Sequence, residues 1–361
     1  MAYGVSDGRG HAEGIAGGIG AGGAGVVFSN VGGTWSTSGG KAINTPSLGS
    51  EAQTDGGLEG AYTSGRNNTL IAQFSQTDVE NTTDQRSGSK CQQFTGAPSV
   101  SNASLYQNQS VLTLTTGTWY RMAYWSKRTA GSAGNVGSTW NLIGLAPSSN
   151  IPGAGITSTT YTEYSRVSRC VNGASFKIDL FVSNSTGSPD TVVLDDISVM
   201  PLALNELLSV SDLAIADVMI GSNIAVSGAA TSIANPVGFA LNVDSSTNPQ
   251  NFVLVYLALI TNSSNYKIYV EKCVGGAYTT VSSTTFTYSA GARLVVQKSG
   301  TEYRVYYNNA LVTAQTISDA GIVNNTLHGL FSTDASNTLD DLTIYAIGSN
   351  GEYAALDAWS S

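Results

Sequence analysis

Two pairs of adjacent aspartates stand in nearly identical settings in the two halves of the chain. Leu194–Val199 and Leu339–Ile344 both read apolar, two acids, apolar, hydroxyl, β-branched. In a regular strand alternate side chains face opposite ways, so Asp195 shares a face with Ile197 and Val199, and the second copy follows the same rule. A carboxylate beside an apolar face is costly unless it is paired, hydrogen-bonded or metal-bound. We interpret each copy as the closing strand of its own β-sandwich.

The stretch Trp119–Lys127 is the second place where residue types and spacing suggest chemistry. As a strand it has one apolar face that reads as core: Tyr120, Met122 and Tyr124. The opposite face carries two indoles and two cations: Trp119, Arg121, Trp125 and Lys127. Flat aromatic rings stack on sugars, and amphipathic side chains supply hydrogen bonds at the rim. We predict a glycan-binding face there, joined by Trp140; the alternative is that the indoles cover the sheet or pack against a partner subunit.

Neither feature supports catalysis. A glycanase needs two acids that flank the scissile bond, whereas Asp340 and Asp341 are adjacent and project to opposite faces of a regular strand. The Glu-x-Asp-x-x-Glu strand of sandwich glycanases is absent from the sequence. His328 has no nucleophile-elbow sequence around it, and no Cys/His spacing typical of a zinc site occurs. The sequence therefore predicts a non-catalytic protein in which His328 is a structural or rim residue.

Composition favours strands over helices. The chain has 361 residues, which suits two domains of ordinary size plus extensions. Only 11% of residues are charged, while 41% are apolar and 41 residues are glycine. Ser, Thr, Asn and Gly, which fill the difference, all weaken helix interiors. The sequence predicts an all-β protein with polar, uncharged surfaces.

Charge and cysteine usage exclude several partners. The formal net charge is −9 and no Lys/Arg cluster occurs, so we expect neither nucleic-acid binding nor attraction to anionic membranes. No apolar run reaches the roughly 18 residues of a membrane span, so we expect no membrane insertion. Met1–Gly25 lacks the basic start of a secretory signal, so we expect synthesis in a host cytoplasm. Cys91, Cys170 and Cys273 lie far apart, and we expect them to be reduced and buried.

The chain divides into four predicted units. Residues 1–50 form a Gly-rich arm, which we expect a neighbouring subunit to hold; the alternative is an arm ordered by its own chain alone. Residues 51–202 form a jelly roll, residues 203–347 a second sandwich, and residues 348–361 a C-terminal tail. Runs with strand character and turn signals between them support both sandwiches; they include Trp119–Lys127, Ser138–Leu145, Thr191–Met200, Val237–Val243, Asn251–Ile260, Ala292–Lys298, Glu302–Tyr307 and Leu339–Ala346.

The first sandwich resembles a known family. Four motifs follow one order: Gly56–Glu59, Gly88–Cys91, Thr118–Lys127 and Leu194–Val199. That order is similar to the jelly-roll carbohydrate-binding modules of the family 4/9/22 type, although Leu58 replaces the family's usual aromatic residue. The resemblance covers about 150 residues and implies a jelly-roll fold with a sugar-binding role.

The same resemblance implies a structural calcium ion. In the family the ion is often held between an early glutamate and the terminal aspartate, which correspond to Glu59 and Asp195, with Asp196 as the alternate ligand. Calcium takes six to eight oxygens, so backbone carbonyls near Lys90 would complete the shell. The alternative is that backbone N–H groups or Lys90 satisfy these carboxylates.

The second sandwich resembles another family. Ala292–Val312, with tight turns at Lys298–Thr301 and Tyr307–Ala310, is similar to the concanavalin/laminin-G sandwich. So is His328–Phe331 followed by Leu339–Ile344. The resemblance implies the fold but not one function, because domains of this kind bind sugars, proteins or nothing measurable.

Together these features favour a virion surface protein of a bacteriophage. We expect a capsid decoration, head-fibre or tail-fibre subunit, forming a homo-oligomer, with a trimer as the specific guess. The arm would contact other virion subunits, and the modules would contact cell-surface glycans. The alternative is an extracellular glycan-binding adhesin or filament subunit.

Overall fold

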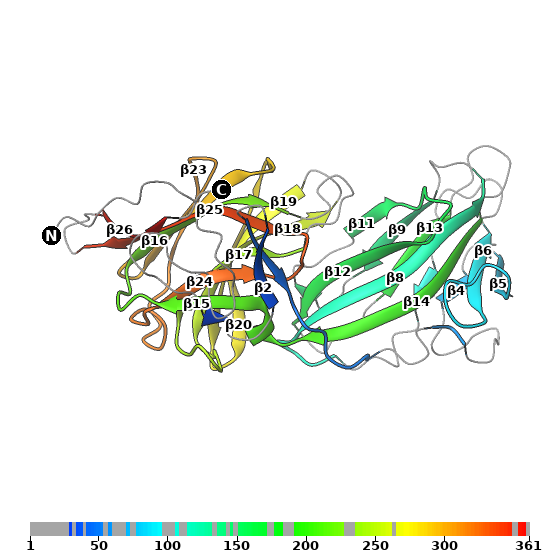
Figure 1. Cartoon of the computed structure of the whole chain (residues 1–361), viewed down its shortest axis with the longest axis horizontal. Helices are drawn as coiled ribbons and strands as arrows, with labels where there is room; N and C mark the ends of the chain where they lie inside the picture. The colour runs from blue at the N-terminus through cyan, green and yellow to red at the C-terminus, as the bar shows by residue number, and fades with distance from the viewer. Residues whose placement is uncertain are drawn as a thin grey trace.

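The computed structural model describes strands, turns and one short 3-10 helix. It covers residues 29–30, 34–38, 41–52, 57–59, 70–72, 77–95, 105–107, 114–131, 136–141, 145–146, 151–171, 177–182, 191–226, 235–261, 265–348 and 353–358. Figure 1 shows two β-rich lobes side by side along the long axis. Within these ranges there is no α-helix, and none of the elements could cross a membrane as a helix. The predicted all-β sandwich fold is confirmed.

The first sandwich forms the lobe on the right of Figure 1. Its main sheet is antiparallel and six-stranded, in the order β10-β12-β8-β14-β6-β5, and smaller sheets of three (β11-β9-β13) and two strands (β4-β7) accompany it. The strands are β4 (Leu70–Ala72), β5 (Thr77–Asn81), β6 (Cys91–Thr95), β7 (Leu105–Gln107), β8 (Trp119–Ala130), β9 (Val136–Asn141), β10 (Leu145–Ala146), β11 (Ile151–Gly155), β12 (Thr162–Cys170), β13 (Lys177–Val182) and β14 (Thr191–Leu202).

The second sandwich packs a seven-stranded sheet, β1-β15-β24-β17-β18-β19-β20, against an eight-stranded sheet, seven strands of which follow the order β2-β3-β25-β16-β21-β22-β23. Strand β26 extends it beside β25. The strands are β1 (Ser29–Asn30), β2 (Thr34–Ser38), β3 (Lys41–Thr45), β15 (Leu208–Asp212), β16 (Val218–Ala225), β17 (Val237–Val243), β18 (Phe252–Thr261), β19 (Asn265–Val274), β20 (Ala277–Phe286), β21 (Ala292–Ser299), β22 (Glu302–Tyr307), β23 (Ala310–Thr316), β24 (Leu327–Ser332), β25 (Thr338–Ile347) and β26 (Tyr353–Ala358).

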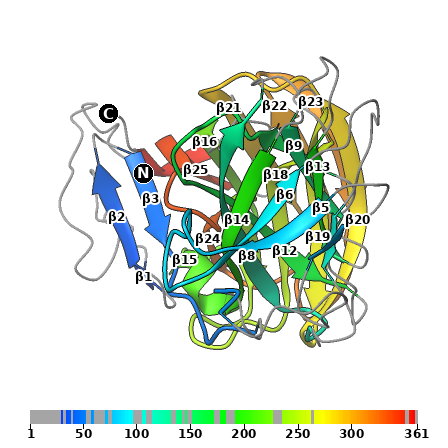
Figure 2. The same cartoon turned by 90° about the vertical axis from the view of Figure 1, so that its right-hand side faces the viewer.

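The described end of the predicted arm is part of the second sandwich. Strand β1 pairs with β15, and β3 pairs with β25 where Ala42 lies opposite Leu339. Trp35 and Ala42 are buried in the core of that sandwich. In Figure 2 β2 and β3 lie at one side of it, away from β20. The described strands of the first sandwich are therefore inserted between β3 and β15, and β1, β2 and β3 belong to the second sandwich rather than to a separate arm. Residues 1–28 lie outside the described part.

The chain crosses between the lobes twice. On the first crossing, Gly49 and Ala52 donate their N–H groups to the carbonyls of Pro201 and Val199, both at 2.8 Å, so this segment runs along the edge of β14. On the second, β14 leads through the 3-10 helix η2 (Leu204–Leu207) into β15. Two crossings restrict how far the lobes can move apart.

Both aspartate pairs form the same β-bulge. Asp196 has φ 48° and Asp341 has φ 50°, the left-handed region that Asp tolerates better than most residues. In each pair the first carboxylate accepts the N–H of the second residue, at 2.8 Å for Asp195 and 2.9 Å for Asp340. The bulge reverses the alternation of the strand. The expectation that Asp195, Ile197 and Val199 share a face is therefore wrong.

Pairing with β8 shows this reversal directly. Asp195 lies opposite Trp125, while Val199 lies opposite Met122, on the other face of the sheet. The second copy behaves alike, with Asp340 opposite Asn223 and Ile344 opposite Ile220.

An apolar cluster joins the two sandwiches. Trp119 packs with Tyr256 and Phe331, at ring-centroid distances of 6.0 and 5.4 Å, and Val167 and Leu202 belong to the same buried cluster. This cluster covers the outer face of the seven-stranded sheet. On β18, Tyr256 belongs to this cluster, whereas Val253 and Val255 lie on the opposite face of the strand and pack in the core of the second sandwich. One face of β8 is thus partly an interface between the lobes.

A buried ion pair lies beside that cluster. Arg169 of β12 and Glu271 of β19 are 2.7 Å apart, with side chains 4% and 0% exposed. The hydroxyl of Thr280 donates to the same carboxylate at 2.8 Å. The Val167 N–H also donates across the junction, to Asn235 at 2.9 Å. The lobes are held together by directional contacts as well as apolar burial.

Candidate functional site

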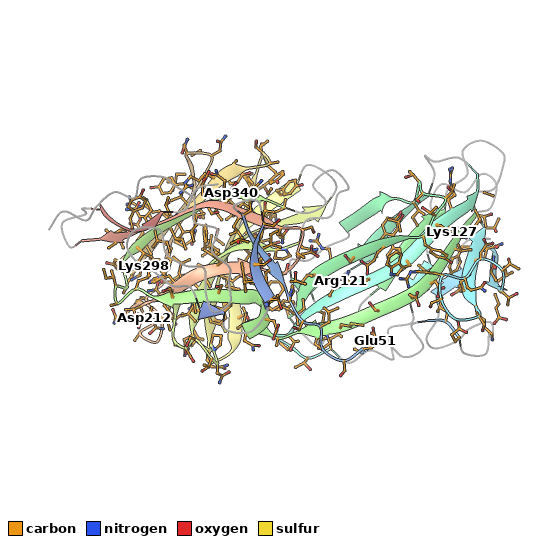
Figure 3. All side chains as sticks on the ribbon, in the orientation of Figure 1. Glu51, Arg121, Lys127, Asp212, Lys298 and Asp340 are labelled. Atoms are coloured by element: carbon orange, nitrogen blue, oxygen red, sulfur yellow. The ribbon has the colours of Figure 1, made fainter. Side chains whose placement is uncertain are left out.

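The predicted glycan face of β8 is divided into separate environments. Tyr120, Met122 and Tyr124 are buried as expected, and Arg121, Trp125 and Lys127 are half-buried on the other face. Arg121 and Lys127 are six residues apart on the strand, about 20 Å by strand rise. Figure 3 shows Arg121 near the junction of the lobes and Lys127 toward the far end of the first sandwich. The two cations do not form one compact site.

The Trp119 side chain is not exposed on the predicted glycan face. Its side chain is 1% exposed and packs on Tyr256 and Phe331 of the second sandwich. A ring covered by another domain has no face free for a sugar. This corrects the prediction, and the reason is that domain packing covers one end of a strand face that the sequence presents as uniform. The alternative interpretation, in which the indoles pack against protein, holds for Trp119. Its partner is the second sandwich of the same chain.

The loop between β5 and β6 covers Trp125 and Lys127. The Arg86 guanidinium carbon lies 3.8 Å from the centroid of the Trp125 ring, and Arg86 is also paired with Asp196. Lys127 Nζ lies 2.9 Å from Asp84 Oδ1, and this hydrogen bond lowers the pKa of Asp84. A sugar would have to displace Arg86 to stack on this face of Trp125.

Trp140 lies on a different sheet from the other predicted residues. It belongs to β9, where it pairs with Ile151 of β11 and Ile178 of β13. Its side chain lies outside the described part of the structure. The sequence could not place it, because membership of a sheet depends on pairing between distant strands.

Arg121 lines a cleft at the junction. Arg121 Nη2 lies 2.8 Å from Glu163 Oε2, with side chains 21% and 32% exposed. The cleft has a volume of 360 Å³ and is also lined by Ser165 of the first sandwich, Thr45 at the end of β3, and Asp334 and Ser336 between β24 and β25. We call it the Arg121 cleft. It combines a guanidinium group, carboxylates and hydroxyls, which suits recognition of a polyhydroxylated ligand.

Both carboxylates of the Arg121 cleft already have donors. Glu163 is paired with Arg121, and Asp334 accepts from Asn235 at 2.8 Å and from the Ser336 N–H at 2.9 Å. Sequence reasoning found Arg121 but missed Glu163, Ser165 and Asp334. No local motif marks them, because three segments far apart in the chain meet only after the first sandwich is inserted into the second.

The predicted calcium ligands are hydrogen-bond acceptors in this structure. Glu59 accepts the Ser89 N–H at 2.9 Å and hydroxyl at 2.7 Å, which lower the pKa of Glu59. Asp195 accepts N–H groups from Arg86 at 2.8 Å and Ser87 at 3.2 Å, although burial raises its pKa.

These donors occupy the oxygens that a cation would need. Within the described ranges there is no group of three or more acidic, histidine or cysteine side chains that could hold a metal. The residues as arranged fit the hydrogen-bonded alternative better than a metal shell. Calcium at Glu59 and Asp195 stays an untested prediction that requires the loop to turn its N–H groups away.

His328 and the cysteines have structural roles. The Nδ1 atom of His328 accepts the Asn242 N–H at 3.3 Å, its Nε2 lies 3.1 Å from the Ile215 carbonyl, and its side chain is 0% exposed. Burial lowers the pKa of His328 to about 4. The three cysteines are free and buried, as expected: Cys91, Cys170 and Cys273.

Comparison with known proteins reveals similarity in architecture only. No protein-family model and no curated protein matches the sequence. The CBM22-1 xylan-binding domain from Paenibacillus barcinonensis Xyn10C matches with a TM-score of 0.31 and 14% identity, covering 44% of this chain and 96% of that chain. The CBM22-1-CBM22-2 tandem domain of the same protein matches with a TM-score of 0.31 and 10% identity, covering 87% and 100%.

A laminin structure also matches this chain. Domains LG4-5 of the mouse laminin alpha1 chain match with a TM-score of 0.24 and 12% identity, covering 72% of this chain and 90% of that chain. The structural neighbours include a carbohydrate-binding module and a pair of laminin domains.

Proposed function

We propose that this protein binds glycans without transforming them, and that the Arg121 cleft is its contact site. The observation that carries the proposal is the cleft itself: a guanidinium–carboxylate pair and several hydroxyls from both sandwiches converge on one 360 Å³ space. Sugar hydroxyls both donate and accept hydrogen bonds, so a site that offers donors and acceptors side by side suits them. The Arg121–Glu163 pair is partly exposed, which leaves it accessible to such a ligand.

The same contacts support binding rather than hydrolysis. Glycoside hydrolysis requires one carboxylic acid to give a proton while a second carboxylate acts on the opposite side of the sugar. Glu163 is held by Arg121, and Asp334 is held by Asn235 and Ser336, so each is engaged by its own donors. The cleft can orient a sugar but has no carboxyl group set apart as a proton donor.

The wider role that we propose is at a virion surface, as a bacteriophage capsid decoration, head-fibre or tail-fibre subunit. Support comes from the 11% charged residues and from the Gly-rich stretch before β1. The two lobes, joined by a buried ion pair and two crossings, would present the cleft on a stiff support. The second candidate is an extracellular adhesin or filament subunit, which the same cleft would serve.

Binding at the Arg121 cleft can be tested with a glycan array of neutral and uronate-containing oligosaccharides. We expect the wild type to bind, and Arg121→Ala and Glu163→Gln to weaken the best ligand about tenfold or more. The matched control is Arg304→Ala, which removes an exposed arginine of the second sandwich. A silent array for the wild type, or equal binding by all variants, would refute the proposal.

Assembly can be tested separately by native mass spectrometry of the full chain and of a chain lacking residues 1–28. The virion proposal predicts a homo-oligomer, with a trimer as the specific expectation, that dissociates when these residues are removed. A full chain that stays monomeric would favour the adhesin over the virion subunit.

A further inference from the structure

A second cleft lies at the junction of the two sandwiches. It has a volume of 470 Å³ and is formed by the turn before β8, the second crossing, the loop between β17 and β18, and the hairpin of β19 and β20. Its polar lining includes Thr118, Asn205, Asn248, Gln250 and Tyr278. We call it the Tyr278 cleft. None of the residues in it belongs to the Arg121 cleft.

The chemistry of the two clefts differs. Every side chain that lines the Tyr278 cleft is uncharged; among them are amides, hydroxyls, the half-buried Tyr278 and the buried Trp119. The Arg121 cleft has a guanidinium and two carboxylates. Because a bound charge needs a partner of opposite sign, an uncharged lining favours a neutral ligand. Amides and hydroxyls beside an aromatic ring are the groups that hold sugars, with hydrogen bonds at the rim of a stacked ring.

The polar groups of the Tyr278 cleft are held in place. Gln250 donates from Nε2 to Asn248 Oδ1 and to the Pro249 carbonyl, both at 3.1 Å. The Gly276 N–H donates to the Gln250 carbonyl at 3.0 Å, which ties the loop to the hairpin. Gln250 Oε1 and Asn248 Nδ2 have no hydrogen bond to the described residues. One free acceptor and one free donor side by side match two neighbouring sugar hydroxyls.

The aromatic wall is held just as firmly. The Tyr278 ring packs edge-on against Phe252 at 5.7 Å, and the guanidinium carbon of Arg169 lies 4.0 Å from its centroid. Arg169 is itself fixed by Glu271. Because the buried ion pair positions both the interface and Tyr278, the cleft is formed before any ligand arrives, which lowers the entropic cost of binding.

We propose that the Tyr278 cleft is a second saccharide site, specific for a neutral sugar unit. Asn248 and Gln250 would bind adjacent hydroxyls, Thr118 and Asn205 would supply further hydrogen bonds, and Tyr278 would contact the ring. The proposal rests on the proposed glycan-binding function but uses none of the residues of the Arg121 cleft. An extended peptide is the competing occupant, since amides also pair with peptide groups.

The test uses the full chain and calorimetric titration with cellohexaose, xylohexaose and laminarihexaose as neutral probes. At least one probe should bind, and Asn248→Ala and Gln250→Ala should each weaken it about tenfold. Both side chains reach solvent, so we expect these variants to fold, and melting curves will verify it. Asn324→Ala, on a different part of the second sandwich, is the matched control.

The outcomes separate this inference from the proposed function. If Arg121→Ala abolishes binding of the neutral probe while Asn248→Ala and Gln250→Ala leave it unchanged, the Tyr278 cleft is overturned and the Arg121 cleft stands. The reverse pattern supports the Tyr278 cleft and places this ligand there. No binding by any glycan overturns both. Binding of an extended peptide competed by none of the sugars also overturns the saccharide assignment.

Discussion

Breaking the buried ion pair between Arg169 and Glu271 is predicted to cost more stability than breaking an exposed pair such as that of Arg304 with Glu302. We consider Arg169→Met, which removes the charge and keeps most of the aliphatic chain. Glu271 is 0% exposed and would retain neutral hydroxyl donors such as Thr280 but no cation. Removing one partner of a buried pair leaves an uncompensated charge, which costs about 3–5 kcal/mol. We expect the free energy of unfolding to fall by that amount.

The control variant is Arg304→Met. Arg304 and Glu302 are 3.0 Å apart, but their side chains are 46% and 42% exposed. Water and salt screen such a pair, so its loss costs about 0–1 kcal/mol. The double variant Arg169→Met with Glu271→Gln removes both charges together. Its loss should be smaller than the sum of the two single losses, because no charge is left buried alone.

Urea unfolding followed by tryptophan fluorescence and by circular dichroism measures these differences. The fluorescence signal combines Trp119 in the interface with the other four tryptophans of the chain, while circular dichroism reports on all strands. Coincident transitions are needed before the midpoints are converted into free energies. If Arg169→Met and Arg304→Met lost stability equally, to within about 1 kcal/mol, the assignment of a desolvated pair at the junction would be refuted.

Three further predictions follow from single sites. Because burial lowers the pKa of His328 to about 4 from 6.5, its contribution to stability is present above pH 6.5 and lost between pH 6.5 and about 4, up to about 3 kcal/mol. His328→Gln should flatten a plot of melting temperature against pH between pH 6.5 and about 4. An unchanged slope in this variant would show that protonation of buried His328 is not the cause of the pH dependence. Asp341→Val should cost about 1–2 kcal/mol more than Asp341→Gly in urea unfolding, because φ is 50° there; equal losses would argue against the bulge. Since N–H groups already occupy Glu59 and Asp195, melting should be the same in chelator and in about 1 mM calcium; a rise with calcium that Glu59→Gln abolishes would instead establish the predicted metal site.

Local patterns in the sequence predicted many of the strands. Val237–Val243 and Glu302–Tyr307 are predicted and observed with the same bounds, because alternation and turn residues act over a few neighbours. Strand β12 is not among the strands that the sequence predicts, although it carries Glu163 and Arg169. Glu163 finds its partner Arg121 on the neighbouring strand β8, and Arg169 finds Glu271 in the other sandwich, and a local pattern shows neither contact.

The candidate sites were less predictable than the strands. Arg121 was found because it stands on a strand face with two tryptophans and a lysine. The rest of its cleft comes from Thr45, Glu163 and Asp334, and the whole Tyr278 cleft arises between segments with no shared motif. Sites at a junction depend on how domains pack, and that packing is decided by long-range contacts such as Trp119 with Phe331.

The sequence by itself determined the all-β class, the core face of β8 and the two matching aspartate pairs, since all three depend on residue type and short spacing. Only the tertiary structure decided that each aspartate pair bulges, that β1, β2 and β3 belong to the second sandwich, and that Trp119 belongs to an interface. The physical reason is distance along the chain. Ala42 meets Leu339, and Arg169 meets Glu271, through burial that no neighbouring residue encodes.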